Sequence, residues 1–198
     1  MVRFLKWLKM KLPFIWLWIE TLNGWLVSLM YGKRIAKATA EVLSHYSAEP
    51  FSYRCISAAD IAPLSRMLTS QTDDYMRFFH PHGFDEATLM RLLKNKSVLM
   101  LGTFKDDEII GYYFIRFFAN GQCFRGNFVD VNYQGKGIGG IMVKQMTEIG
   151  LAAGFRVFAT VSKRNLSSMA STKAYNEIKI IKELPDDDVL IEHLSIKK

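Results

Sequence analysis

The chain has 198 residues, 49% of them hydrophobic, which is enough for one ordinary domain with an appendage. Cys55 and Cys123 are too few for a disulfide framework, and each lies in an expected strand, which favours reduced thiols in a cytoplasmic protein. The formal net charge is +7, and a dense share of the basic residues lies before residue 40. Because these residues alternate with Trp, Phe and Leu, they favour a membrane surface over nucleic acid as the partner.

The first 31 residues contain all four tryptophans and many other bulky apolar side chains. No small-residue cleavage site accompanies them, which argues against a secretory signal. Residues 12–31 have about the length of a spanning helix, but Glu20, Thr21 and Asn23 lie in the middle, where polar groups are costly. A spanning helix is therefore one alternative, and ordinary core helices are another.

On a helix, Glu20, Gly24 and Ser28 fall on one face and form a narrow polar stripe. A polar stripe on a Trp-rich helix is typical of burial in a membrane interface or of docking on another protein surface. We therefore predict that residues 1–37 contact a membrane surface or a partner, and that the protein is cytoplasmic and attached to the inner face of the membrane.

The remaining chain predicts alternating helices and strands. The chain divides into a hydrophobic and basic helical N-terminal segment, 1–46, and a domain, 51–198. The last part of the N-terminal segment is expected to be a polar helix that leads into the domain. Apolar alternation and turn residues predict strands at Phe51–Ile56, Ser97–Phe104, Ile109–Phe118, Cys123–Val131, Val157–Val161, Lys179–Glu183 and Val189–Leu194. Helices are expected from Ser57 to about Leu68, after Asp85, from Ile138 to Leu151, and over Asn165–Asn176, with a loop or broken helix at Asp73–Phe84.

The most informative segment is glycine-rich and lies between an expected strand and an expected helix. Such a turn exposes backbone N–H groups at the positive end of a helix dipole, which makes a cradle for an anion such as phosphate. Gly135, Gly137 and Gly140 also satisfy a dinucleotide-binding spacing. The dinucleotide-binding alternative is disfavoured because the next strand ends at Ser162, Lys163 and Arg164, where an acidic residue would be needed to bind the ribose. In addition, fewer than 60 residues follow Gly140, too few for a doubly wound sheet.

The same segment resembles the Q/R-x-x-G-x-G/A signature of the GNAT superfamily of acyl-CoA-dependent N-acyltransferases, and the element order over residues 51–198 is similar too. The resemblance implies an α/β fold of the α+β type: a mixed, mostly antiparallel central sheet flanked by helices, here with an extra N-terminal hydrophobic helical segment. It implies acetyl-CoA as co-substrate and no metal. The loop amides would hold the pyrophosphate of coenzyme A, the fourth strand would pair with the pantetheine arm, and the last helix would contact that arm. The implied cofactor-binding residues are Gln134, Gly135, Lys136, Gly137, Ile138 and Gly139 in the loop, Phe128, Val129 and Val131 in the strand, and Asn165 in the helix.

The resemblance also implies direct acyl transfer, with a backbone N–H near Val131 polarising the thioester carbonyl. The family's proton-donating Tyr is absent from its usual place in the last helix, which holds Thr172. Tyr175 lies three residues further on and could reach the thiol only if the helix is shifted or bulged.

Three residues are candidates for the general base: His80, His82 and Asp130. The alternative for the histidines is that they fix their loop by hydrogen bonds, and Asp130 could instead bind the substrate amine or face solvent. The spacing His80-Pro81-His82 alone does not complete a metal site.

The acceptor is expected to be a small-molecule primary amine, and membrane attachment favours an amino sugar of surface glycan assembly. Protein or peptide N-acetylation is the second possibility. The third is a non-catalytic module that binds acyl-CoA or docks a partner. Aromatic residues that could line the acceptor pocket, or simply be core, are Tyr75, Phe78, Phe79, Phe84, Tyr112 and Tyr113.

Overall fold

The computed structural model describes residues 13–46 and 49–197, with side chains from Leu17 onward. The basic residues before Pro13 on which the expected membrane contact partly rests lie outside this range. In chain order the elements are α2 (Pro13–His45), β1 (Ser52–Cys55), η1 (Ala58–Asp60), α3 (Ile61–Thr69), α4 (Asp73–Met76), α5 (Glu86–Lys94), β2 (Val98–Lys105), β3 (Glu108–Phe117), β4 (Gln122–Val129), η2 (Val131–Tyr133), α6 (Ile138–Ala152), β5 (Arg156–Ser162), α7 (Leu166–Tyr175), β6 (Asn176–Glu183) and β7 (Asp188–Ile196).

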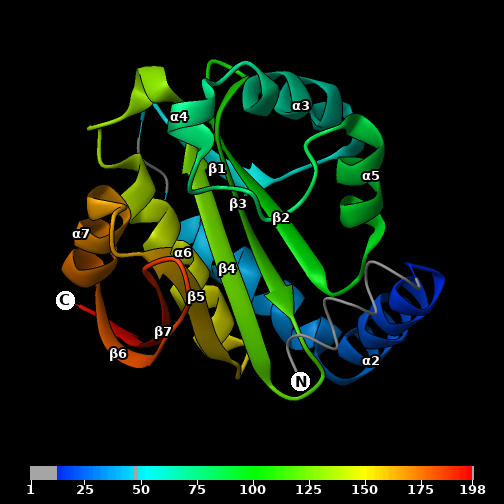
Figure 1. Cartoon of the computed structure of the whole chain (residues 1–198). Coiled ribbons are helices and arrows are strands. Elements are labelled where there is room, and N and C mark those ends of the chain that lie inside the picture. The colour runs from blue at the N-terminus through cyan, green and yellow to red at the C-terminus, as the bar shows by residue number, and fades with distance from the viewer. Residues whose placement is uncertain (1–12, 47–48, 198) are drawn as a thin grey trace.

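The centre of the fold is a seven-stranded sheet in the order β1-β2-β3-β4-β5-β7-β6 (Figure 1). Neighbouring strands are antiparallel except β4 and β5, which run parallel. Helices flank the sheet, so the predicted fold class, a mixed and mostly antiparallel sheet with an N-terminal helix, is confirmed.

The parallel pair β4–β5 is joined only at its beginning. Pairing covers Gln122–Phe124 of β4 and Arg156–Phe158 of β5, and stops there although both strands continue. The backbone edges of residues 125–129 and 159–162 are therefore unpaired with each other, which leaves a gap in the middle of the sheet for another molecule.

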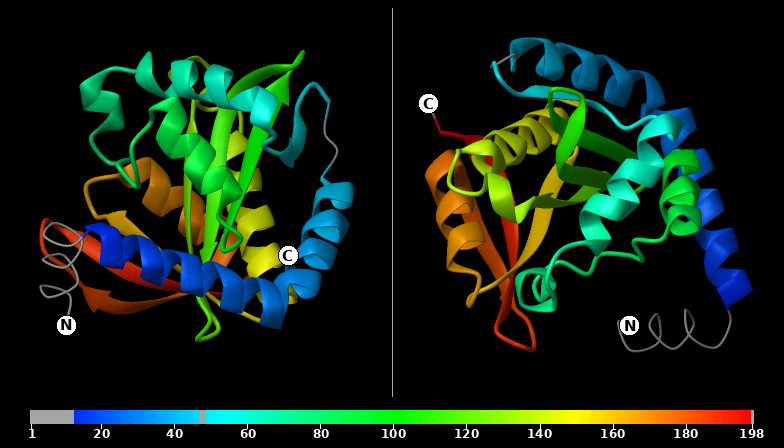
Figure 2. Two further views of the ribbon diagram at one scale, coloured as in Figure 1. Left: turned by 90° about the vertical axis from the view of Figure 1, so that its right-hand side faces the viewer. Right: turned by 90° about the horizontal axis from the view of Figure 1, so that it is seen from above.

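Each face of the sheet carries its own hydrophobic core (Figure 2). On one face α2 and α6 contribute Val27, Val42, Met142 and Met146. On the other face α3 and α5 pack their leucines, including Leu64 and Leu89, against the sheet. The sheet is thus buried on both sides, and ligand access is concentrated at the β4–β5 gap.

Local turn chemistry agrees with the sequence predictions. The β2–β3 and β6–β7 turns each contain two consecutive aspartates with positive φ, the conformation of tight hairpin turns. The expected broken helix at Asp73–Phe84 begins with a single helical turn, α4. Strand β4, predicted to reach Val131, ends at Val129 because the Asp130 side chain accepts from Asn132 N and begins the 3-10 turn η2.

The long helix α2 turns its polar stripe toward the chain's own domain. Glu20 pairs with Arg116 on β3, and Asn23 donates to Phe117 O at 2.9 Å and accepts from Ala119 N at 3.1 Å. Gly24 is buried against the 95–97 turn, where an added Cβ would lie 3.0 Å from Asn95 Oδ1. The polar stripe thus packs on the chain's own domain and not on a membrane or a partner, as the alternative of an ordinary core helix implies.

The opposite face of α2 is apolar and exposed. Leu22, Trp25, Leu29 and Met30 are each more than half exposed, with Leu29 at 70%. The helix changes direction part-way along, so that its second half follows the edge of the molecule (Figure 2). Among the residues that the structure describes, none of the helices combines the length and the apolar character needed to cross a bilayer.

We predict that Asn23→Ala lowers the free energy of unfolding by about 1–3 kcal/mol, because it leaves Phe117 O and the Ala119 N–H without their partner beneath α2. Chemical denaturation measures this change. Thr21→Ala is the matched control, since Thr21 bonds only within its own helix at Leu17 O and should change stability by less than about 0.5 kcal/mol. Equal effects of the two substitutions would mean that α2 is not anchored through Asn23.

Candidate active site

The glycine-rich loop has the geometry of an anion cradle. Gly135 and Gly137 have φ of 73° and 76°, in the left-handed region that favours glycine. Gly137 is the N-cap of α6, has no side chain to satisfy the first helical N–H groups, and faces open space. The first turn of α6 carries no acidic residue. Its N–H groups and helix dipole are therefore available to a phosphate-type ligand.

The unpaired edge of β4 adds backbone groups to the same site. Asp130 N donates to Ile110 O of β3, and Gln122 O accepts from Phe118 N directly after β3, so both point to the β3 side. Because backbone groups alternate along a strand, the N–H and C=O groups that point into the β4–β5 gap belong to Arg125, Asn127 and Val129. Phe128, predicted to offer its backbone, directs that backbone to β3 and contributes its aromatic side chain to the site wall.

Two cavities open on this gap and meet in it. The first, of about 400 Å³, runs from the glycine loop along β4 to α7. The second, of about 780 Å³, lies between the Phe78–Pro81 segment and the β6–β7 turn. Residues common to both are Phe78, Phe79, Arg125, Gly126, Thr160 and Ser162. A ligand in the first cavity would therefore contact a ligand in the second where β4 and β5 diverge.

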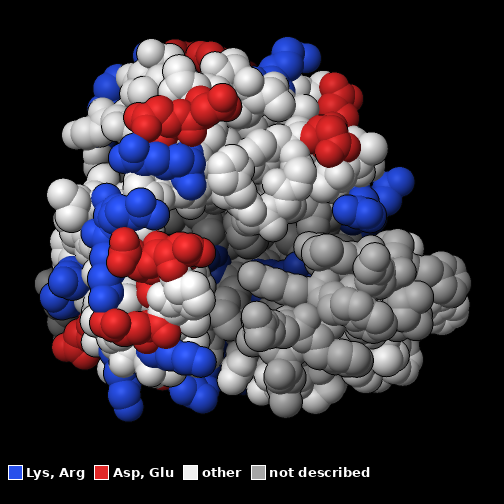
Figure 3. Space-filling view, in the orientation of Figure 1, with Lys and Arg blue, Asp and Glu red and all other residues white. Residues whose placement is uncertain are grey.

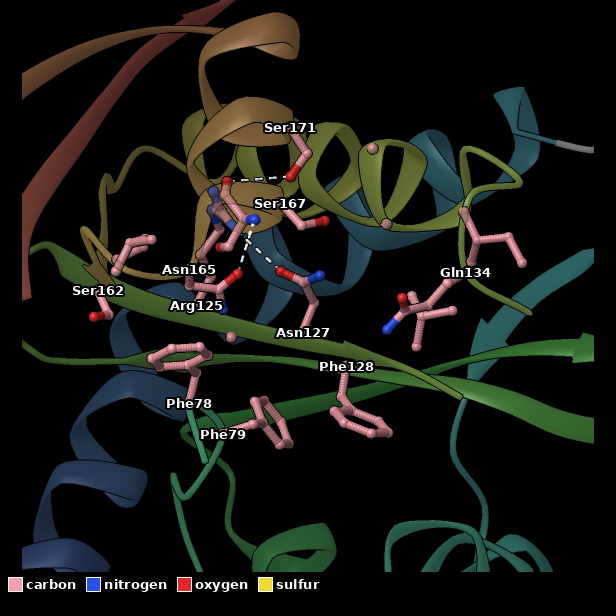
Figure 4. Close-up of a pocket in the computed structure, with 18 of the residues that line it drawn as sticks. Phe78, Phe79, Arg125, Asn127, Phe128, Gln134, Ser162, Asn165, Ser167 and Ser171 are labelled. Carbon is pink, nitrogen blue, oxygen red and sulfur yellow. Dashed lines mark hydrogen bonds between the residues drawn. The ribbon is translucent and has the colours of Figure 1, made fainter. Parts of the chain in front are cut away.

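The two sides of β4 differ in chemistry. Figure 4 shows the side chains of Arg125 and Asn127 on the side of α7, and the rings of Phe78, Phe79 and Phe128 on the other side. The rim of the second cavity carries both charges, Arg77 and Arg164 with Asp186 and Asp188. Basic and acidic side chains alternate along this side of the molecule (Figure 3).

Arg125 is the most unusual residue of the site because it is a charged side chain with only 7% exposure. Its Nε and one terminal nitrogen lie 3.2 and 2.9 Å from His193 Nε2, and the same terminal nitrogen donates to Thr172 Oγ1 at 3.4 Å. Burial lowers the pKa of Arg125 to about 9, which leaves it a cation at neutral pH. Burial and the neighbouring Arg125 charge lower the pKa of His193 to about 2, so the imidazole is neutral there.

Helix α7 places the sequence-predicted residues at different points of the first cavity. Asn165 lines the cavity and also caps α7 by accepting from Ser168 N at 3.0 Å. Thr172 is buried and engaged by Arg125. The Tyr175 ring lines the cavity close to Gly140, where an added Cβ would lie 2.1 Å from ring atom Cε2. The helix thus presents Tyr175 to the α6 end of the groove and Thr172 to the β4–β5 junction.

The two loop histidines have different surroundings. His80 is exposed and lines the second cavity. His82 is not among the lining residues of either cavity: its Nδ1 lies 2.8 Å from Gly83 O and its Nε2 lies 3.1 Å from Tyr112 OH. Burial lowers the pKa of His82, which keeps it neutral in this aromatic environment. These contacts are those of a side chain that fixes the loop.

Asp130 and Val131 lie beyond the end of the gap. Asp130 accepts from Gln71 Nε2 at 2.7 Å, in addition to its bond from Asn132 N. The Val131 N–H donates to Gln71 Oε1 at 3.2 Å, so it is engaged rather than directed at a ligand. The expectation that Val131 polarises a carbonyl fails in this structure because β4 ends two residues earlier.

The remaining loop residues follow the expectation in part. Gln134 and Gly139 line the first cavity, and Ile138 does so while also packing into the core. Lys136 does not line the cavity itself, but its Nζ lies 4.7 Å from the centre of the ring of Tyr133, which does. In the described part of the chain no group of three or more His, Cys, Asp or Glu side chains could hold a metal ion.

Sequence reasoning missed Arg125, Asn127, Gln71 and the acidic rim of the second cavity. Only Arg125 left a signal: it is the one charged residue of its strand, two positions after the buried Cys123 and so on the same face of the sheet. Tyr75, expected as a pocket aromatic, lines the first cavity and donates to Val129 O at 2.6 Å. Tyr112 and Tyr113 are fully buried core residues.

Solved structures with the same fold are acetyltransferases. The PaiA N-acetyltransferase of Thermoplasma acidophilum, determined in complex with coenzyme A, is 18% identical, with a TM-score of 0.59 over 72% of this chain and 98% of its own. The ribosomal-protein-S5-alanine acetyltransferase of Vibrio fischeri is 17% identical, with a TM-score of 0.60 over 76% of this chain and 95% of its own. AAC(6′)-Ib, determined with paromomycin and acetyl-CoA, is 16% identical, with a TM-score of 0.58 over 74% and 94%.

A search of curated protein sequences gives no match. The family model described as the acetyltransferase (GNAT) family matches residues 64–174, more than half of the chain. The matched range runs from α3 through the glycine-rich loop to α7 and contains most of both cavities. With this match, the divergent β4–β5 pair and the glycine cradle at α6, the chain belongs to the GNAT family of acetyltransferases.

Proposed function

We propose that the protein is an N-acetyltransferase that moves an acetyl group from acetyl-CoA to a primary amine by direct transfer. The observation that carries this proposal is the meeting of two cavities at the point where β4 and β5 diverge. One cavity begins at a phosphate cradle, and the other has aromatic walls and a rim on which Asp186 and Asp188 lie with Arg77 and Arg164, so a thioester and an amine can be held side by side. Proximity of this kind supplies much of the rate enhancement in transfer reactions.

The first cavity suits coenzyme A along its whole length. The amides around Gly135 and Gly137 would hold the pyrophosphate at the α6 N-terminus. The free backbone groups of Asn127 and Val129 would pair with the amides of the pantetheine arm, as a further strand would. For Val129 this requires the Tyr75 hydroxyl to release the carbonyl oxygen that it now binds. Asn165 lines the opposite wall.

The second cavity suits the acceptor amine. Asp186 and Asp188 attract an ammonium group, and His80 is placed to remove a proton from it. As the thioester carbonyl is attacked, a backbone N–H on the β4 edge stabilises its developing negative charge. Tyr175 is the candidate proton donor to the departing thiol, because it lines the coenzyme side of the groove.

An amino sugar fits the second cavity best among amine acceptors. Phe78, Phe79, Phe114 and Phe124 line the cavity and offer apolar faces on which a sugar ring can stack. Among similar folds, structures of AAC(6′)-Ib were solved with paromomycin and with kanamycin, and others are named as acetyltransferases of ribosomal proteins. The aromatic walls of the cavity are the reason to prefer an amino sugar over a protein terminus. We propose that this acceptor belongs to surface glycan assembly, because the exposed apolar face of α2 suits a membrane surface, where such glycans are made.

We predict that Gly137→Glu weakens coenzyme A binding by about tenfold or more, because it puts a carboxylate at the pyrophosphate cradle. Calorimetric titration of the full chain with acetyl-CoA measures this effect. Gly121→Glu is the matched control: Gly121 has the same φ of 76° and equally open surroundings, but it lies in the β3–β4 turn.

Both substitutions should cost about 1–2 kcal/mol of folding stability from backbone strain. Only Gly137→Glu should lose coenzyme affinity. If the two variants bind acetyl-CoA equally well, the loop is not the pyrophosphate site.

We predict that His80→Gln lowers kcat for acetyl transfer by about a hundredfold or more, the usual contribution of a general base. The measurement is release of free thiol from acetyl-CoA with an amine acceptor, for which nucleotide-linked amino sugars are the first choice. His82→Gln is the control: it removes the contact with Tyr112 and should reduce thermal stability more than turnover.

An unchanged rate in His80→Gln would remove His80 from the mechanism. Absence of thiol release with every amine tested would favour a non-catalytic acyl-CoA-binding module.

We further propose that the exposed face of α2 attaches the protein to an anionic membrane surface. Trp25, Leu29 and Met30 lie beside Lys33, Arg34 and Lys96 around a shallow recess. An apolar helix face bordered by cations is typical of helices that lie in the interface of a bilayer with anionic headgroups. The charge of the border is the reason to prefer a lipid surface over a protein partner.

We predict that the double variant Trp25→Ala, Leu29→Ala binds vesicles containing phosphatidylglycerol about tenfold more weakly, since two of the most exposed apolar side chains are lost. Co-sedimentation of the full chain with such vesicles measures binding. The control is Ile180→Ala, Ile181→Ala, which removes two exposed apolar side chains from β6 instead. Failure of the unaltered protein to bind these vesicles would leave a protein partner as the occupant of this face.

A further inference from the structure

Arg125 is a buried cation whose partners are all neutral. Its bonds go to the imidazole of His193, the hydroxyl of Thr172 and the amide oxygen of Asn127. None of the ion pairs formed by the described residues involves it. A charge removed from water without an opposite charge costs several kcal/mol, so such residues persist where something compensates the charge.

The contacts with His193 fix the guanidinium in place without neutralising it. His193 accepts through Nε2, so its proton lies on Nδ1, which has no hydrogen-bond partner among the described residues. The other terminal nitrogen of Arg125 makes one long bond, 3.4 Å to Asn127 Oδ1. Asn127 lines the first cavity, so this nitrogen is on the ligand side and has donor capacity to spare.

The position of Arg125 indicates which groups could balance its positive charge. Pairing between β4 and β5 ends at Phe124 and Phe158, and Arg125 is the first residue beyond that point. It lines both cavities, at the place where the reacting groups of two substrates would meet. A group on either substrate can therefore reach it.

We propose that Arg125 binds a carboxylate carried by one of the two substrates, next to the atoms that react. This inference rests on the proposed acyltransferase function and narrows its substrate class. The planar guanidinium fork matches the two oxygens of a carboxylate. One buried positive charge balances one negative charge, which favours a carboxylate over a phosphate dianion.

The carboxylate has two possible sources with the same chemistry. It can be the far end of a dicarboxylic acyl group that enters from the coenzyme side, or it can belong to an amine acceptor that carries an acid group. In both cases the bound carboxylate supplies the opposite charge that the buried guanidinium lacks. A neutral analogue of the same size leaves the positive charge of Arg125 without a partner.

The test compares matched pairs of substrates on the full chain. In the first arm, calorimetry compares succinyl-CoA with butyryl-CoA, which has the same number of acyl carbons and no carboxylate. In the second arm, thiol release from acetyl-CoA compares acidic amines with neutral counterparts: muramic acid with glucosamine, and each of the standard amino acids with its amide. We expect a preference of about tenfold or more for the carboxylate in one arm, and that arm identifies the source.

Variants then assign the preference to Arg125. In Arg125→Gln the ratio between the paired substrates should fall toward one, whatever the absolute affinity becomes, whereas Arg125→Lys should retain part of it. Arg156→Gln is the control, an arginine on neighbouring β5 that is paired with Glu192 and lines neither cavity. A purely structural Arg125 would change stability in these variants without changing the ratio.

The outcomes separate the two proposals. Binding of acetyl-CoA without a carboxylate preference in either arm overturns the role of Arg125 and leaves the acyltransferase function intact. Absence of any acyl-CoA binding overturns the proposed function, and this inference with it. A preference that persists in Arg125→Gln also contradicts the assignment. If Arg125→Gln does not fold, the substrate ratios of the unaltered protein and of Arg125→Lys still decide the question.

Discussion

The separation of β4 from β5 is the constraint on which the rest of the site depends. Two parallel strands that share only three paired positions leave backbone donors and acceptors unsatisfied in the middle of a sheet, an arrangement that costs free energy unless a ligand completes it. The glycine loop, α6 and α7 surround this opening, and both cavities end in it. The active site is thus a gap in the hydrogen bonding of the sheet, lined by the elements that hold its two edges apart.

The interior of the gap holds a fixed charge that is almost completely shielded from solvent, because Arg125 is only 7% exposed. Arg125, His193 and Thr172 link β4, β7 and α7 across the site, and the neutral imidazole holds the cation without cancelling its charge. An electrostatic interaction in such surroundings is stronger than in water, so the charge can discriminate between substrates that differ by one carboxylate. The contact between Arg125 and Thr172 reaches the last helix at the position where the pattern that the chain resembles has a tyrosine.

Helix α2 turns polar side chains toward the domain and large apolar side chains toward solvent, the reverse of an ordinary surface helix. Glu20 and Asn23, polar residues in an apolar stretch, face inward and bind the end of β3, while Trp25 and Leu29 face solvent. The apolar surface left outside is bordered by cations, a combination that suits a lipid interface. Because Val27 and Val42 of the same helix belong to the core that it shares with α6, the proposed membrane surface lies on an element that the fold itself needs.

The sequence by itself determined the order of strands and helices, the hairpin turns and the glycine cradle, because each is set by residues close together in the chain: aspartates that accept positive φ, glycines at the α6 N-terminus, apolar alternation in the strands. Only the tertiary structure decided which groups meet across the site. Arg125 and His193 are 68 residues apart, Gln71 reaches Val131 N across 60, and Arg116 reaches Glu20 across 96. Such contacts depend on how the sheet and helices pack, and no local pattern encodes that packing.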